Sequence, residues 1–189
     1  MKRVTSQTEA IRKVLQALEQ AGIPYMIVGS VAASFHGFSR ATHDLDVVAS
    51  LTPESVHKLA NALGEEFYFD EQAALKAAAQ HDVANAIHME SGIKVDFWVL
   101  HEDEYSRVQF SRRVCIDFEG TPACIASAED TILSKLLWYQ ETRSDRQLSD
   151  VQAVLETNKD NLDWQYLGEW ANRLGVDDLL KDMRHSDFS

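Results

Sequence analysis

The chain has 189 residues, of which 45% are hydrophobic and 25% are charged. These fractions are ordinary for a globular protein, so they exclude collagen-like, low-complexity and wholly disordered chains. No apolar run approaches the roughly 20 residues that a membrane-spanning helix needs. The chain has 2 cysteines, too few for a disulfide framework, and we expect a cytoplasmic protein with reduced thiols.

Acidic residues outnumber basic ones: 30 Asp and Glu stand against 18 Lys and Arg, for a net charge of −12. A protein that grips nucleic acid through its phosphates normally carries a basic surface. The charge balance therefore disfavours a general nucleic-acid-binding protein, although it permits a local basic groove. Most of the negative charge is interpreted as a solvated surface.

The first two thirds of the chain alternate between helical and extended patterns. Apolar residues at helical spacing predict a helix over 6–21, which Gly22 and Pro24 end. Further helices are predicted at 31–36, 52–63 and 71–80, and strands at 25–28, 44–49, 83–89, 94–100, 114–118 and 123–126. Turns at 90–92 and 120–122 predict that the last four strands form two hairpins. The second hairpin carries Cys115 and Cys124, which could lie opposite each other in it. We interpret them as a pair of core thiols, with a redox role as the alternative.

From Ser127 onward the pattern is helical. Residues 127–130 resemble a capping box that opens a long helix, which runs to Tyr139. More helices are predicted around 148–155, 162–170 and 179–180. We therefore expect an α/β (α+β) core over 1–126 and a helical subdomain over 127–189 that packs on it.

Two carboxylates stand close together in one predicted strand. Asp44 and Asp46 are two residues apart, so their side chains point to the same face of a sheet. Such carboxylates repel each other and raise one pKa unless a cation neutralises them. Mg²⁺ is the natural cation, because it prefers oxygen ligands. Taken alone, an Asp-x-Asp pair more often marks a strand end that faces solvent.

A third acid and a glycine turn strengthen this interpretation. Asp96 lies in an apolar strand, and three carboxylates meet if that strand lies beside 44–49. Three carboxylates suffice for two metal ions about 3.5–4 Å apart, the arrangement used for in-line phosphoryl transfer. Gly29 and Ser30 separate a strand from a helix, where backbone amides can contact a phosphate.

These features together resemble a known family. A strand that ends in Gly29-Ser30, Asp-x-Asp after 13 intervening residues, and a later single Asp are similar to the nucleotidyltransferase superfamily related to DNA polymerase beta. Residues 40–46, Arg-Ala-Thr-His-Asp-Leu-Asp, resemble the Arg-x-Thr-x-Asp-x-Asp form of its minimal members and of AbiEii-type toxins.

The resemblance implies a core with a mixed sheet and a set of site residues. It assigns metal ligation to three acids, Asp44, Asp46 and Asp96. Asp96 would also help to deprotonate the attacking hydroxyl. It assigns contacts with the phosphates of an NTP to Gly29, Ser30, Arg40 and Thr42. The implied cofactor is Mg²⁺, with two ions expected and Mn²⁺ as an alternative.

The helical half matches two further motifs of AbiEii-type toxins, Lys-x₄-Lys-x₂-Arg and Arg-x₃-Asp. Lys135 and Arg143 match the ends of the first motif, while Gln140 replaces its middle Lys. Arg146 and Asp150 match the second motif. The resemblance implies that the basic residues reach the triphosphate and that Arg146 and Asp150 pair on one helix face. The alternative is that all four are ordinary surface charges.

The implied function is transfer of a nucleoside monophosphate from an NTP to an acceptor hydroxyl of RNA, protein or a small molecule. An AbiEii-like toxin would also have a cognate antitoxin as its partner. Two alternatives remain open. One is a nucleotide-binding regulatory module without turnover, and the other is an enzyme that adenylylates an antibiotic.

Overall fold

The computed structural model describes residues 2–38 and 42–185. The chain divides into two compact units. The first consists of Met1–Val28 and Thr42–Ile125, and the second of Gly29–Ala41 and Ala126–Ser189. In the described part of the chain, no helix is both long enough and apolar enough to cross a membrane.

The first unit is built on a seven-stranded sheet with the order β3-β4-β5-β2-β1-β7-β6. Its strands are β1 (Tyr25–Val28), β2 (Asp44–Ala49), β3 (Phe67–Phe69), β4 (Val83–His88), β5 (Lys94–Val99), β6 (Val114–Phe118) and β7 (Thr121–Ile125). β2 runs parallel to β5 and β1 parallel to β7, whereas the other neighbours are antiparallel. The sheet is therefore mixed, and both expected hairpins are present.

The helices described in the same unit are α1 (Lys2–Ala21), α3 (Pro53–Leu63), α4 (Glu71–Gln80) and α5 (Glu104–Ser111), with a 3₁₀ turn at Gly64–Glu66. α3 begins where its sequence predicts, after Thr52 as the N-cap. Thr52 and Ser55 form a capping box. The Thr52 hydroxyl accepts from the Ser55 amide at 3.2 Å, and the Ser55 hydroxyl accepts from the Thr52 amide at 2.8 Å. α5 was not predicted. It buries no residue, so its sequence lacks an apolar period.

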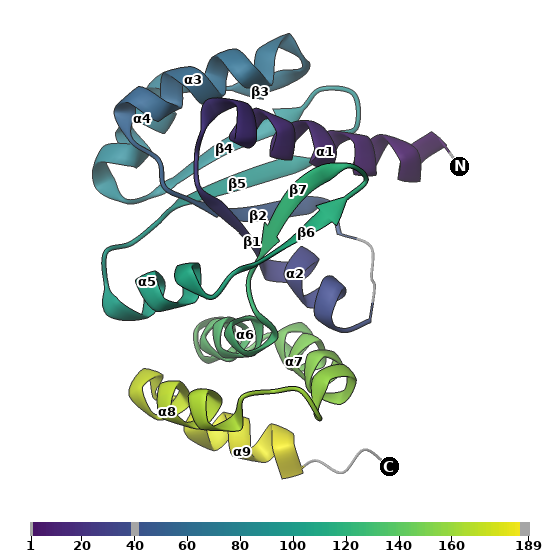
Figure 1. Cartoon of the computed structure of the whole chain (residues 1–189), viewed down its shortest axis with the longest axis vertical. Helices are drawn as coiled ribbons and strands as arrows, with labels where there is room; N and C mark the ends of the chain where they lie inside the picture. Colours follow the sequence, from purple (N-terminus) through teal and green to yellow (C-terminus); the bar gives the residue numbers. More distant parts are fainter. Residues whose placement is uncertain (1, 39–41, 186–189) are drawn as a thin grey trace. The chain divides into compact units, whose positions relative to one another are not determined.

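The core of this unit follows from alternation along its strands. β2 buries Leu45, Val47 and Ala49, and β5 buries Val95, Phe97 and Val99, on the face that α1, α3 and α4 cover (Figure 1). The intervening residues of β2 and β5 point to the opposite face and are half-buried or exposed. The alternation that builds the core therefore also directs the acidic side chains out of it.

The second unit is helical, with α2 (Gly29–His36), α6 (Ala128–Thr142), α7 (Asp145–Asn158), α8 (Trp164–Leu174) and α9 (Asp177–His185). The sequence predicts a division of the chain at 126/127 with α2 in the core, whereas α2 groups with the later helices. It packs against α6 and α7. A Cβ at Gly37 would lie 3.0 Å from the Cβ of Ala153, so glycine permits this close approach.

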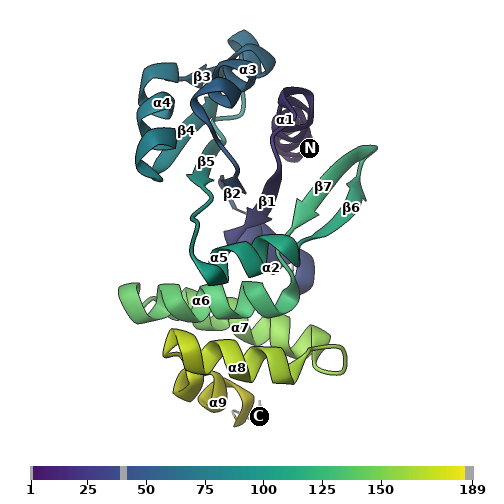
Figure 2. The same ribbon diagram turned by 60° about the vertical axis from the view of Figure 1, so that its left-hand side comes forward.

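The two cysteines are not core thiols, and this expectation is wrong. Cys115 and Cys124 lie directly opposite each other in β6 and β7, and they form a disulfide. Cys115 is exposed and Cys124 is half-buried. The physical reason is the position of the hairpin, which forms one edge of the sheet (Figure 2). Along β6, the outermost strand, every residue is exposed or half-buried, so Cys115 is not enclosed in a core.

Candidate active site

The pairing of β2 with β5 brings the three predicted acids together. These strands are parallel neighbours, and Asp46 is the register partner of Asp96. Asp44 precedes Asp46 by two residues and therefore projects from the same face. All three carboxylates thus lie on the sheet face opposite the core, within the first unit.

Asp96 is held by two neighbouring side chains. The Lys94 Nζ lies 2.9 Å from each of its carboxylate oxygens. Asn85, on β4, donates to its Oδ1 from the amide nitrogen. The Asp96 side chain is 15% exposed, whereas that of Lys94 is 47% exposed. The hydrogen bond to Asp96 raises the pKa of Lys94, and the charges of Asp44 and Asp46 act in the same direction.

Asp46 accepts a hydrogen bond from the indole Nε1 of Trp98, at 3.3 Å. The sequence interpretation had not singled out Lys94, Asn85 or Trp98. Lys94 and Trp98 lie two residues either side of Asp96, so strand periodicity could have placed them on its face. Asn85 could not have been found in this way, because its position depends on the register of β4 against β5.

The three carboxylates are the right kind of ligand for a divalent metal ion, but their side chains do not point to one common position. Carboxylate oxygens on one face are the ligands that a hard divalent cation prefers. Within residues 2–38 and 42–185, however, no three His, Cys, Asp or Glu side chains gather closely enough to hold one. Asp96 is directed to Lys94 and Asn85, and Asp46 is directed to Trp98.

The predicted phosphate contacts stand at the start of α2 and before β2. Gly29 has a φ of +65°, a left-handed conformation that favours glycine, and it directly follows Val28, the register partner of Asp46. The expected turn at Gly29 is the first turn of α2 itself, with Ser30 as its second residue. The Thr42 hydroxyl bonds the backbone of Asp44, donating to its carbonyl at 3.2 Å. Arg40 lies outside the described residues.

In the second unit, Lys135 and Asp150 form a buried ion pair. The Nζ of Lys135 on α6 lies 2.8 Å from Oδ2 of Asp150 on α7, and the side chains are only 5% and 7% exposed. The structure thus joins the first residue of one predicted motif to the last residue of the other. The predicted contact of Lys135 with the triphosphate, and the predicted role of Asp150 in orienting Arg146, stay predictions.

The other motif positions lie at the surface of the second unit. Arg143 ends α6 in a left-handed conformation, with its guanidinium 5.5 Å from the centre of the Tyr139 ring. Arg146 is exposed on α7. Gln140, which replaces a Lys of the toxin motif, donates to the carbonyl of Gly175 at 2.6 Å. This side chain therefore links α6 to the connection between α8 and α9.

Residues 2–188 match the family described as "Nucleotidyltransferase of unknown function (DUF6036)". The chain belongs to this family. No curated protein sequence matches the chain.

The solved structures that share the nucleotidyltransferase fold include the following two. An antigenic nucleotidyltransferase-like protein from Paracoccidioides brasiliensis is 18% identical, with a TM-score of 0.59 over 93% of this chain and 90% of the other. The structure of ANT(2")-Ia in complex with adenylyl-2"-tobramycin is 16% identical, with a TM-score of 0.55 over 96% of this chain and 99% of the other. At these identities the likeness shows the fold alone.

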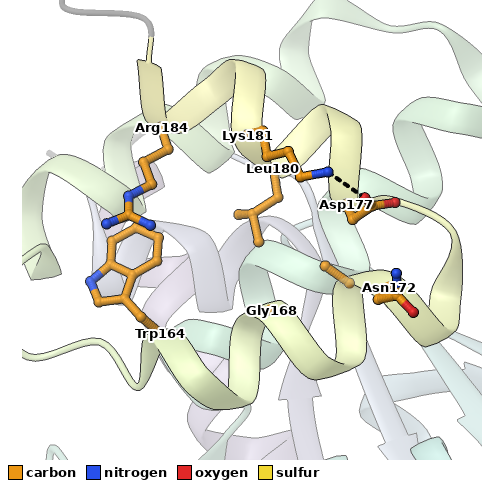
Figure 3. A pocket seen from close by; sticks show the side chains of 8 residues that line it. Trp164, Gly168, Asn172, Asp177, Leu180, Lys181 and Arg184 are labelled. Carbon is orange, nitrogen blue, oxygen red and sulfur yellow. Dashed lines mark hydrogen bonds and ion pairs between the residues drawn. The ribbon is translucent and has the colours of Figure 1, made fainter.

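This nucleotidyltransferase-family protein also has a pocket of about 310 Å³ between α8 and α9 (Figure 3). Its charged groups already have partners. The Arg184 guanidinium lies 4.5 Å from the Trp164 ring centre, and Lys181 pairs with Asp177 at 2.6 Å. The residues that line it include none of the predicted site residues. We assign it no function.

Proposed function

We propose that the protein transfers a nucleoside monophosphate from an NTP to a hydroxyl group of an acceptor and releases pyrophosphate. The observation that carries this proposal is the register of β2 and β5, which sets Asp46 opposite Asp96 with Asp44 on the same face. These acids would hold Mg²⁺, or Mn²⁺, with two ions expected. When bound, such ions stabilise the charge on the attacking and leaving oxygens of an in-line displacement.

The residues of the chain then have separate roles. Asp96 accepts the proton of the attacking hydroxyl, because a carboxylate within hydrogen-bond reach can act as a general base. The backbone amides of Gly29 and Ser30, at the N-terminus of α2, suit the β- and γ-phosphates. Further phosphate contacts are proposed for a polar set around these two elements and in the helical unit: Arg40, Thr42, Arg143 and Arg146. For Lys135 we propose a structural role in place of the predicted phosphate contact, because its ammonium group is buried against Asp150. Asp150 orients its basic neighbours.

The charge of the protein bears on the acceptor. With a net charge of −12, the chain repels a polyanion such as RNA and attracts a cationic acceptor. The shared fold of ANT(2")-Ia, solved with an adenylylated tobramycin, favours an antibiotic adenylyltransferase as the second candidate. An AbiEii-like toxin with a cognate antitoxin has less support. Gln140 occupies the position where those toxins carry Lys, and its side chain donates a hydrogen bond to the Gly175 carbonyl.

The test is a transfer assay with NTPs labelled at the α-phosphate, Mg²⁺ or Mn²⁺, and two acceptor pools: a cell extract and a panel of cationic antibiotics. We expect a labelled acceptor and release of pyrophosphate. The variant Asp46→Asn should lower the rate by at least about a hundredfold, about 3 kcal/mol of transition-state stabilisation. The variant Glu90→Gln, an exposed acid in the turn after β4, should keep the wild-type rate.

Each other outcome selects another function. NTP binding in calorimetry without any consumption would contradict transfer and favour a regulatory module. A labelled antibiotic would identify the resistance enzyme. Growth arrest on expression, lost in Asp46→Asn, would favour a toxin. A γ-label recovered as phosphate, and not as pyrophosphate, would contradict nucleotidyl transfer in favour of simple hydrolysis.

A further inference from the structure

We propose that Lys94 is an internal counter-cation of the candidate site, which occupies the Asp96 carboxylate and which a divalent ion must displace. Lys94 would then set how tightly the site binds that ion. This inference rests on the proposed function, because it takes Asp96 to be a metal ligand.

The contact geometry places the ammonium group where a cation would bind. The Nζ is 2.9 Å from Oδ1 and 2.9 Å from Oδ2, so it contacts both oxygens of the carboxylate. Asn85 donates to Oδ1 as well. Because the Asp96 side chain is 15% exposed, little water competes for these oxygens. In this arrangement both carboxylate oxygens of Asp96 already contact the ammonium group, so an ion that takes both oxygens must replace the Lys94 contact.

The sheet register extends the effect to the other two acids. Lys94 is the register partner of Asp44, and Asp46 is the partner of Asp96. One positive charge thus lies among three carboxylates on the same face, which reduces their mutual repulsion in the ion-free protein. A divalent ion at that position would be repelled by the ammonium group at short range. Ion and ammonium therefore compete for the same place.

Lys94 is also able to leave. Its side chain is 47% exposed, so its ammonium can move into water when an ion binds. The same face carries Trp98 and Asn85, which keep Asp46 and Asp96 hydrogen-bonded.

The ordinary alternative is an exposed ion pair that has no connection with a metal, and it predicts no change in metal affinity when Lys94 is replaced.

The experiment measures Mn²⁺ affinity of the full chain without nucleotide, by electron paramagnetic resonance and by calorimetry. Lys94→Met keeps an unbranched chain and removes the charge, and we expect Mn²⁺ to bind at least about tenfold more tightly, the scale of outer-shell effects on metal sites. Lys94→Arg keeps the charge and should bind within about twofold of wild type. Lys58→Met is the matched control, since it removes a lysine that pairs with Glu54 on α3 and changes the net charge equally.

A double-mutant cycle with Asp96→Asn tests whether the change in Mn²⁺ affinity acts through the Asp96 carboxylate. In that background, adding Lys94→Met should no longer tighten Mn²⁺ binding, because the shared carboxylate is gone. If Lys94→Met binds Mn²⁺ no more tightly than Lys58→Met does, the inference is overturned. It is also overturned if neither wild type nor Lys94→Met binds Mn²⁺ at millimolar concentration.

The transfer assay separates this failure from failure of the proposed function. Turnover that Asp46→Asn abolishes, together with unchanged Mn²⁺ affinity in Lys94→Met, would remove the counter-cation and keep the transferase. Tighter Mn²⁺ binding in Lys94→Met without any NTP consumption would keep the role of Lys94 and remove the transferase.

Discussion

The two units each contain a Lys–Asp pair of almost the same length, in very different surroundings. On the sheet face of the first unit, Lys94 lies 2.9 Å from Asp96, with the lysine 47% exposed. Between α6 and α7 of the second unit, Lys135 lies 2.8 Å from Asp150, and both side chains are less than a tenth exposed. Distance therefore does not distinguish the pairs, whereas burial does.

The difference decides what each pair can do. A buried charge that loses its partner stays uncompensated, so the Lys135–Asp150 pair must hold together in the folded protein. A half-exposed lysine can exchange its partner for water or an ion, so the Lys94–Asp96 pair can open during function. The two motifs that match Lys135 and Asp150 in the sequence identify the residues but not their burial.

Replacement of Lys135 by Met should have the largest effect on stability. It leaves Asp150 buried and unpaired, and we expect the free energy of unfolding to fall by about 3–5 kcal/mol. Urea unfolding followed by circular dichroism measures it. The double variant Lys135→Met with Asp150→Leu should recover most of the loss, since an apolar pair needs no charge compensation. If Lys135→Met keeps wild-type stability and loses only NTP affinity, the pair serves ligand binding and burial does not make it essential to the fold.

Periodicity made the sheet face predictable. Alternation along 44–49 and 94–99 places the three acids on one side of each strand, and the hydrophobic partners fix which side is the core. Glycine turns and caps similarly located α3 and the two hairpins. These features are local, so a single sequence contains them.

Contacts between distant elements were not predictable. The pairing of Lys135 with Asp150 depends on how α6 packs on α7, and the grouping of α2 with the helical unit depends on Gly37 and Ala153. β3 has only three residues and α5 buries none, so neither shows a periodic pattern. The disulfide was missed because the reduced state was assumed and because spacing alone does not report exposure.

A second buried acid in the helical unit sharpens the comparison. Asp130 is fully buried, and the Tyr166 hydroxyl donates to its Oδ1 at 2.6 Å. Tyr166→Phe removes one hydrogen bond to this buried carboxyl group and leaves its Oδ1 without that donor, and we expect a loss of about 1–3 kcal/mol in urea unfolding. Tyr68→Phe, on the exposed face of β3, is the matched control and should be neutral. Equal small changes in both variants would show that burial does not govern these contacts.

The pH dependence of the free energy of unfolding tests whether burial also governs His36, a group that burial favours in its neutral form. Burial lowers the pKa of His36 below 6.5, and its Nε2 bonds the Ala126 carbonyl at 2.7 Å. The unfolded chain then binds a proton more readily than the folded chain, so this stability is present above pH 6.5 and is lost as the pH falls below it. One proton limits the slope to about 1.4 kcal/mol per pH unit. The unfolding free energy should fall between pH 7 and 5 with a slope below this limit. The contribution should be lost in His36→Gln and kept in His101→Gln, which alters an exposed histidine.

Replacement of Lys94 should have the smallest effect on stability, although it is expected to change metal affinity most. The pair is partly exposed and screened by water, so Lys94→Met should lower the ion-free unfolding free energy by less than about 1 kcal/mol. That difference should shrink further when the salt concentration rises from about 0.05 to 0.5 M, because ions screen exposed charges. Urea unfolding in EDTA measures both quantities. A loss as large as that of Lys135→Met would mean that the half-exposed pair is a fixed part of the fold, and an ion could then not displace Lys94 without unfolding the sheet face around Asp96.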